Sequence, residues 1–397
     1  MRPASEAERA RLNDTFAALC AISSPFGHER ACADDVTARL RAMGLEVEED
    51  RAGEGHPDGA GNLLARIPGR SERTVLLCAH LDTVEQSAPI EPVLVDGGWE
   101  NANDGILGAD NKAALAVMLE VARRASVEGS PVGIELLFTI AEEDGLVGAL
   151  RFDTSRLRSE FGYVFDHATP IGEVITASPT YFRVAADFHG RAAHAGLRPE
   201  DGRSAILAAA HAIAAMPLGR IDAETTANVG SVNGGVGSTN VVPERCRLLA
   251  EARSIDPDRV EAVVAQMIDA LNDGAAAAEC DVDIDVRRLF AGYRQKPSSP
   301  AVVAAEAALR ACGYEPRRIA SGGASDANAF EAAGIPVVNL ANGTQHNHEP
   351  TERVSVAALE AMLDVALALL DEAAALPASA TTPAPEPAPA PLPDSAA

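Results

Sequence analysis

The sequence predicts an α/β protein in which a mixed-sheet domain carries a smaller, inserted α+β domain. From about residue 74, apolar runs alternate with helical patterns, which is typical of layered α/β folds whose strands are buried on both faces. The pattern changes at about residue 178 and returns after about residue 294. We therefore expect one discontinuous α/β domain that is interrupted by a second domain.

The segments of the α/β pattern can be assigned one by one. In chain order they are TVLLCAHLD, DNKAALAVMLEVARRA, VGIELLFTIAEED and FGYVFDHA, then AVVAAEAALRACG and IPVVNLA after the interruption. The short apolar runs indicate buried strands, and the longer segments have helical spacing. A last segment, EAMLDVALALLDEAAAL, indicates an amphipathic helix that closes the fold.

The inserted segment has a different pattern. It starts with YFRVAADFHG, whose alternation is typical of a strand with one solvent-facing side, and continues with a helix, two strands, a second helix and a last strand, DVDIDVRRLF. This β-α-β-β-α-β order predicts a ferredoxin-like domain. The expected division is 1–177 and 295–375 for the α/β domain, 178–294 for the insert, and 376–397 for a disordered tail rich in proline and alanine.

Composition excludes several classes of function. The chain has 397 residues, of which 47% are apolar, so it can form two domains with proper cores. The 33 basic and 58 acidic residues give a net charge of −25, which opposes binding to nucleic acid or to an anionic membrane. We find no secretory signal pattern and no long apolar run, so we expect a cytoplasmic protein. Six cysteines without a CxxC pair indicate neither a disulfide framework nor a zinc knuckle.

Polar residues at the ends of the apolar runs are candidates for a site. His80 and Asp82 end TVLLCAHLD two residues apart, so on an extended backbone they point the same way. His80 could then bind a metal while Asp82 orients the imidazole ring. The competing interpretation is a core histidine held by a neighbouring aspartate.

Other candidates each have an ordinary structural explanation. Asp110 could simply cap a helix, Asp166 could leave a strand in a turn, His348 could be a solvated loop residue, and Glu142 and Glu143 could be an acidic pair in a turn. An α/β sheet that brought them to one rim with His80 would gather a mixed nitrogen and oxygen ligand set. Zinc accepts such a set, and a bridging carboxylate favours two metal ions over one, with a position left open for water.

These segments together resemble a known family. The motifs are HLDT at 80–83, GADNK at 108–112 and AEEDGLVGA at 141–149, followed by the strand end at Asp166, GRAAHAG and HEPTE. They resemble the dinuclear metallopeptidases that include peptidase T, carboxypeptidase G, aminoacylase and succinyl-diaminopimelate desuccinylase, and are most similar to the peptidase T-like members. The resemblance extends from about residue 12 to about residue 372.

The resemblance implies a role for each candidate ligand. His80 and Asp166 would hold one metal ion, Glu143 and His348 the other, and Asp110 would bridge the two. The cofactors would be two divalent ions, zinc in the first place, with cobalt or manganese as alternatives. His346 is the competing histidine, but the HxxxE spacing of HEPTE favours its neighbour.

The resemblance also implies the groups that act on the substrate. Glu142 would be the general base and Asp82 would support the metal-binding histidine. His194, in GRAAHAG, would reach the substrate from a partner subunit, so a homodimer formed through the insert, acting as lid and dimerisation domain, is expected. Asn240 and Arg253 would bind the substrate, and Arg253 suits a free carboxylate.

The resulting prediction is a zinc-dependent amide hydrolase acting on small peptides, a peptidase T-like aminopeptidase or tripeptidase. An N-acyl amino acid deacylase or desuccinylase of the same family is an alternative, because these enzymes share their metals and base. A non-catalytic metal- or peptide-binding protein is a second alternative. A serine hydrolase using Ser325 or Ser231 is a third, although neither residue lies in a GxSxG motif. His167, directly after Asp166, departs from the family pattern.

Overall fold

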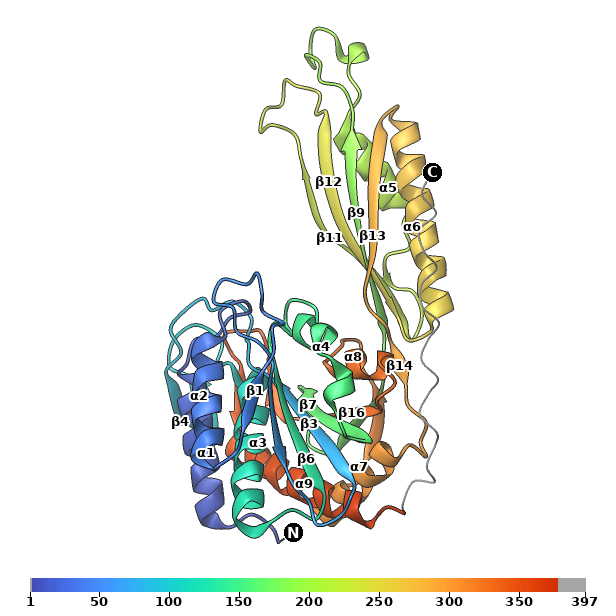
Figure 1. Ribbon diagram of the computed structural model, residues 1–397. Coiled ribbons are helices and arrows are strands. Elements are labelled where there is room, and N and C mark those ends of the chain that lie inside the picture. The colour runs from blue at the N-terminus through green and yellow to red at the C-terminus, as the bar shows by residue number, and fades with distance from the viewer. Residues whose placement is uncertain (1, 378–397) are drawn as a thin grey trace, which may run out of the picture.

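Two large β-sheets organise the chain, and Figure 1 shows the five-stranded one projecting away from the domain that contains the nine-stranded one. The structure is a computed structural model that describes residues 2–377. The predicted tail, 376–397, therefore lies outside the described residues except for its first two positions. Among residues 2–377, none of the helices combines the length and the apolar character that crossing a lipid bilayer requires.

The larger sheet has nine strands, and its four central strands are parallel to one another. Antiparallel neighbours flank them, so the sheet is mixed, as predicted. In spatial order the strands are β1 (Val47–Glu49), β2 (Leu63–Ile67), β6 (Gly133–Thr139), β3 (Thr74–His80), β7 (Phe161–His167), β16 (Val337–Ala341), β8 (Glu173–Ser178) and β14 (Tyr293–Arg294), with β15 (Arg317–Ala320) also paired to β8.

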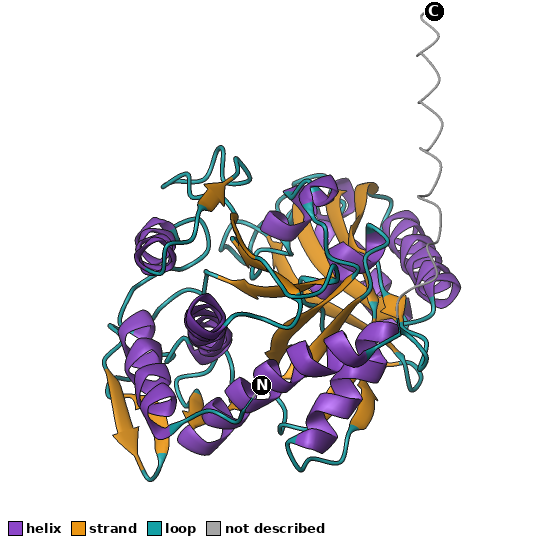
Figure 2. Cartoon of the chain, turned by 60° about the horizontal axis from the view of Figure 1, so that its bottom comes forward, coloured by secondary structure: helices purple, strands orange, loops and turns teal. Residues whose placement is uncertain are grey.

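Both faces of this sheet are buried because alternate strand residues pack on opposite sides. Along β3, Leu77 and Ala79 join the main core, whereas Leu76 and Cys78 join a smaller core on the other face. The helices at the main core are α1 (Glu6–Cys20), α2 (Arg30–Ala42), α3 (Ala109–Glu128), α7 (Pro300–Ala311) and α9 (Val356–Ala375), and those at the other face are α4 (Val147–Arg151) and α8 (Ala327–Ala332). Figure 2 shows helices on both sides of the strands.

A small antiparallel sheet lies at the edge of this domain. Its strands, in spatial order, are β17 (Thr344–Gln345), β18 (Arg353–Ser355), β5 (Gly98–Asn101) and β4 (Pro92–Val95). It places the segment that follows β16 next to the segment that precedes α3.

The second sheet is antiparallel throughout. Its spatial order is β10 (Gly219–Arg220), β11 (Thr225–Gly234), β12 (Arg245–Ser254), β9 (Thr180–His189) and β13 (Asp281–Phe290), and α5 (Ala205–Ala215) and α6 (Pro257–Ala277) form a core with one of its faces. Apart from the short β10, the chain order is the predicted β-α-β-β-α-β. The loops 190–204 and 235–244 lie at the end of this sheet remote from the larger domain (Figure 1).

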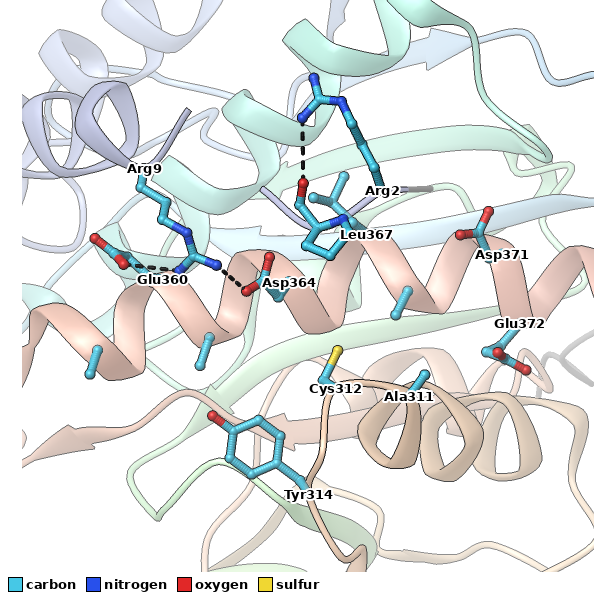
Figure 3. A pocket seen from close by; sticks show the side chains of 14 residues that line it. Arg2, Arg9, Ala311, Cys312, Tyr314, Glu360, Asp364, Leu367, Asp371 and Glu372 are labelled. Atoms are coloured by element: carbon cyan, nitrogen blue, oxygen red, sulfur yellow. Dashed lines mark hydrogen bonds and ion pairs between the residues drawn. The ribbon is translucent and has the colours of Figure 1, made fainter. Parts of the chain in front are cut away.

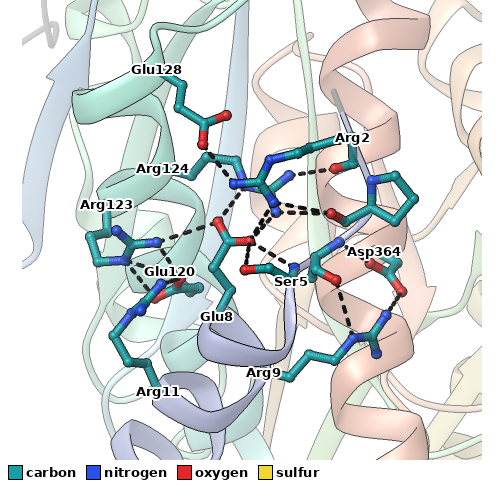
Figure 4. Close-up of polar contacts among 12 residues, drawn as sticks. Arg2, Ser5, Glu8, Arg9, Arg11, Glu120, Arg123, Arg124, Glu128 and Asp364 are labelled. Atoms are coloured by element: carbon teal, nitrogen blue, oxygen red, sulfur yellow. Dashed lines mark hydrogen bonds and ion pairs between the residues drawn. The ribbon is translucent and has the colours of Figure 1, made fainter.

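A buried ionic cluster ties the N-terminus to α3 (Figure 4). Arg124, only 1% exposed, donates to both carboxylate oxygens of Glu8, at 2.8 and 2.7 Å. Ser5 and Arg2 add further hydrogen bonds to the same carboxylate. Near this cluster, a cavity of about 590 Å³ lies along α9 (Figure 3), with Arg9, Cys312 and Asp364 among its lining residues. None of the site residues predicted from the sequence lines it.

Candidate metal centre

The predicted ligands lie beyond the carboxyl ends of the four parallel strands, where open α/β sheets form their sites. β3 ends at His80, β6 leads into Glu142 and Glu143, and Asp166 is the penultimate residue of β7. β16 leads into the loop that carries His348, and Asp110 lies at the start of α3. The polar residues that the sequence singled out thus lie in the last positions of these strands or in the loops that follow them, except for Asp110 at the start of α3.

Asp110 lies between two histidines. Its Oδ1 is 3.4 Å from Nε2 of His80, and its Oδ2 is 3.5 Å from Nε2 of His348. The same nitrogen of His80 is 3.8 Å from Oδ1 of Asp166, and that of His348 is 2.8 Å from Oε1 of Glu143. The five side chains therefore form one continuous cluster with Asp110 at its middle.

The cluster fits a metal ion because its inner atoms lack hydrogen-bond partners. Within residues 2–377, Nε2 of His80 and Oδ1 of Asp110 are both buried and neither has a hydrogen-bond partner. Such orphaned buried atoms are uncommon and require an explanation, for which an ion is a natural one. Two groups of side chains could each hold an ion, because within each group the candidate ligand atoms all lie within 4.8 Å of one another. One group is His80, Glu142 and Asp166, and the other is His80, Asp110 and Glu143.

Crowded carboxylates in a buried site also shift their pKa values. Burial, followed by the charge of Asp110, raises the pKa of Asp166 to about 8. Burial and the charge of Asp166 raise the pKa of Glu142 well above its ordinary value. A cation in the cluster would counter both effects, because it favours the charged form of each carboxylate.

Asp82 connects the end of β3, where His80 lies, to the loop that carries the glutamate pair. Nδ1 of His80 lies 3.0 Å from the backbone oxygen of Asp82 and 3.4 Å from its Oδ1. The same carboxylate accepts the backbone N–H groups of Glu142 and Glu143, each at 3.0 Å. The sequence predicted the contact with the histidine but not the second contact.

Glu352 shapes the loop before α3. Its carboxylate, 2% exposed, accepts backbone N–H groups from Leu107, Gly108 and Asp110 at 2.7–3.0 Å. Burial raises the pKa of Glu352 to about 7. Glu352 ends the HEPTE motif, so the motif contains both His348 and the carboxylate that fixes Asp110.

Asn339 and Asp326 were not identified from the sequence. The side chain of Asn339 accepts the N–H of Asp166 and donates to its backbone oxygen, both at 2.9 Å. Asp326, 1% exposed, accepts a hydrogen bond from the hydroxyl of Thr139 at 2.5 Å. A polar residue inside the apolar run IPVVNLA was a usable signal for Asn339.

Two neighbouring histidines have other partners. Nδ1 of His346 lies 3.7 Å from Oε2 of Glu349. Nδ1 of His167 lies 3.2 Å from the hydroxyl of Thr169, and burial lowers the pKa of this histidine.

The insert residues are not all close to the cluster. Arg253 lies over the ring of Tyr181, 4.2 Å from its centroid, pairs with Glu251, and reaches the backbone oxygen of Gly322 at 3.5 Å. Arg253 thus lies at the inner end of the insert, beside the loop before α8.

His194 and Asn240 lie at the outer end of the insert. Both are exposed, and the backbone N–H of Ala195 donates to the backbone oxygen of Asn240. β9, which has ten residues and is therefore about 33 Å long, separates this end from the larger domain. Within one chain, His194 and Asn240 are therefore not brought to the metal centre.

Comparison with known proteins agrees with this architecture. The peptidase dimerisation domain of the M20 group matches residues 180–279, and peptidase family M28 matches residues 62–170. The uncharacterized protein YqjE of Bacillus subtilis is 36% identical over 366 residues, which are 92% of this chain and 98% of YqjE.

Two solved structures are similar over nearly their whole length. The aminopeptidase PepT of Bacillus cereus has 38% sequence identity and a TM-score of 0.84, over 92% of this chain and 99% of PepT. A tripeptidase of Staphylococcus aureus has 34% identity and a TM-score of 0.88, over 93% and 99%. The family predicted from the motifs is confirmed: the chain belongs to the M20 family of metallopeptidases.

Proposed function

We propose that the protein is a dinuclear, zinc-dependent aminopeptidase that cleaves small peptides such as tripeptides. The observation that carries this proposal is the position of Asp110 between His80 and His348, with one carboxylate oxygen directed to each. A carboxylate in that position suits a bridge between two cations. His80 with Asp166, and His348 with Glu143, would complete the two sites.

Zinc fits the donor set because it accepts imidazole and carboxylate together, although manganese or cobalt also bind such oxygen-rich sites. Two bound cations would lower the pKa of a water molecule and polarise the carbonyl group of the peptide bond. The chain itself must then supply a group that accepts the proton of the attacking water and delivers it to the departing amine.

Glu142 is the residue that we assign to this proton transfer. It follows the strained Ala141 and precedes Glu143, whose carboxylate already contacts His348. A carboxylate oxygen of Glu142 lies within 4.8 Å of the candidate ligand atoms of His80 and Asp166, so it can reach a water held at that side of the centre. A carboxylate at hydrogen-bond distance from such a water is one of the groups that commonly serve as a general base.

The insert supplies the substrate contacts in this proposal. Arg253 offers a guanidinium group at the inner end of the insert, where the carboxylate of a short peptide can pair with it. His194 and Asn240 would act on the centre of a partner subunit, so the proposed enzyme is a homodimer formed through the insert. The exposure of both residues in their own chain supports this arrangement.

The alternative substrate class is an N-acyl amino acid, because a deacylase would need the same metals and base. Metal content should be measured beside hydrolysis of di-, tri- and N-acylated peptides, before and after chelation. We expect about two metal ions per chain and chelator-sensitive cleavage of peptides with a free amino terminus. Cleavage of the blocked substrates alone would instead identify a deacylase.

A single substitution tests whether Glu142 is the general base. Glu142→Ala should retain the metal ions and lose nearly all cleavage. Full activity in a metal-loaded Glu142→Ala enzyme would refute the proposed mechanism.

A further inference from the structure

Four consecutive backbone N–H groups around the glutamate pair are each held by a buried side chain. The segment 140–143 turns sharply after β6, and none of these four N–H groups continues the strand ladder. The acceptors are Oδ1 of Asn62 for Ile140 at 3.1 Å, Oε1 of Glu29 for Ala141 at 3.1 Å, and the two oxygens of Asp82 for Glu142 and Glu143 at 3.0 Å each. The backbone conformation of the segment 140–143 is thus held by side chains from elsewhere in the chain.

Glu29 is the acceptor that comes from outside the sheet. It lies at the N-terminus of α2, is 0% exposed, and its Oε1 also accepts the N–H of Gly27 at 2.8 Å. The segment around Gly27 is itself paired to Thr83, because the N–H of Phe26 donates to the oxygen of Thr83 at 3.1 Å. Glu29 therefore joins the loop after β6 to a segment that already contacts the loop after β3.

The residue that Glu29 holds has an unusual backbone conformation. Ala141 has a φ of +47°, in the left-handed region that L-residues with a Cβ rarely adopt. Such a conformation persists only where its surroundings enforce it. The hydrogen bond from Ala141 to Glu29 is one of these restraints, and the next residue in the chain is Glu142.

We propose that Glu29 is a positioning residue for amide hydrolysis: by holding the N–H of Ala141, it fixes the direction in which Glu142 presents its carboxylate. This inference rests on the proposed function, in which Glu142 accepts a proton. Glu29 touches neither the substrate nor the metal ions in this role, and acts only through the backbone of the segment 140–143.

The test compares Glu29→Ala and Glu29→Gln with a matched control. Glu135 is also 0% exposed and accepts the N–H groups of Arg158 and Ser159, at 2.8 and 3.0 Å, at the opposite end of β6. Glu135→Ala therefore removes an equally buried acceptor of two backbone N–H groups, but at the end of β6 that is remote from the metal centre.

We expect Glu29→Ala to lower kcat by about 10–100-fold, the range found when groups that orient catalytic residues are removed, with KM and metal content changed less than about twofold. Glu29→Gln should recover most of kcat, because its amide oxygen can accept the same hydrogen bonds. Glu135→Ala should lower the melting temperature and leave kcat unchanged. If Glu29→Ala does not fold, Glu29→Asp withdraws the acceptor by one methylene and should lower kcat in the same way.

Three results would overturn the role of Glu29: an unchanged kcat in both Glu29→Ala and Glu29→Asp, an equal loss of kcat in Glu135→Ala, or no recovery in Glu29→Gln. Failure of the proposed function is a different result, because the unaltered protein would then show no metal-dependent cleavage at all.

Discussion

The carboxylate of Asp82 accepts the backbone N–H of Glu142 at 3.0 Å. The other oxygen of the same carboxylate accepts the N–H of Glu143, so one side chain positions both the proposed base and the neighbouring proposed ligand. Its Oδ1 also lies 3.4 Å from the ring of His80. Asp82 therefore acts on the centre through three groups at once.

Asp82→Asn should weaken this arrangement because an amide has only one acceptor oxygen. Its NH₂ group would face one of the two N–H donors, leaving a buried donor without a partner. We expect a fall of about 10–100-fold in kcat or in metal affinity. Steady-state kinetics and metal content measure these two effects separately. Wild-type values for both would show that the hydrogen bonds to Asp82 are not needed for activity or for metal binding.

Metal binding should strengthen as the pH rises from 6 to 8. Burial and the charge of Asp110 raise the pKa of Asp166 to about 8, and the hydrogen bonds that the ring of His348 donates to Asp110 and Glu143 raise the pKa of His348 to about 10. Both groups therefore hold protons in the metal-free protein that a metal ion must displace. Competition with a chelator at pH 6, 7 and 8 measures the affinity, and a pH-independent affinity would contradict the prediction.

The same pKa shifts determine whether the stability of the metal-free protein rises or falls with pH. A carboxyl group or a histidine with a raised pKa in the folded state binds more protons folded than unfolded, so its contribution is lost as the pH rises. For Asp166 the loss falls between its ordinary pKa of about 4 and about 8, and for His348 between about 6.5 and about 10. Thermal unfolding of the chelated protein should show falling stability across this range, and zinc should reverse it.

The fold could be predicted because its signals are local. Alternation along YFRVAADFHG and uniform apolarity along VGIELLFTI distinguish a strand with one wet face from a strand buried on both faces, and the structure has β9 and β6 there. Residues such as His80 and Asp166 could be proposed as ligands because they end such runs, and parallel strands bring their carboxyl ends together.

The supporting residues could not be predicted in the same way. Glu29 contacts a residue 112 positions further along the chain, and Glu352 contacts a loop about 245 positions before it. Neither lies at the end of an apolar strand, and hydrophobic periodicity contains no information about which distant backbone group a carboxylate will accept. The position of His194 at the outer end of the insert could not be predicted either, because it depends on how far β9 extends from the larger domain.

Removal of Arg124 should destabilise the protein strongly. Arg124 is buried and pairs with Glu8 through two hydrogen bonds, and Arg124→Met would leave that carboxylate buried without its main partner (Figure 4). Breaking a buried pair in this way costs about 3–5 kcal/mol. Urea unfolding at pH 7 measures the loss, and Arg2→Met, which removes a half-exposed partner of the same carboxylate, is the milder control.

The pH dependence of this cluster follows from Glu8. Burial alone raises the pKa of Glu8, but hydrogen bonds from Arg124 and Ser5 outweigh it, so the pKa is held below its ordinary value. A carboxyl group with a lowered pKa stabilises the folded state at pH values above its unfolded pKa of about 4.3, and this contribution is lost at lower pH. The difference between Arg124→Met and the unaltered protein should therefore shrink on acidification below pH 4, and a difference that does not change with pH would contradict this origin.

A mixing experiment tests whether His194 acts on the centre of a partner subunit. His194→Ala and Glu142→Ala should each be nearly inactive alone, because the first lacks the insert histidine and the second lacks the proposed base. In a mixed dimer, the subunit that keeps Glu142 would receive His194 from its partner, and one of the two centres would be complete. Random exchange forms such dimers in about half of the population, so activity should recover to about a quarter of the unaltered level. If His194 instead served its own subunit, every centre would lack one of the two residues and mixing would restore no activity. Light scattering on the same samples shows whether the subunits associate.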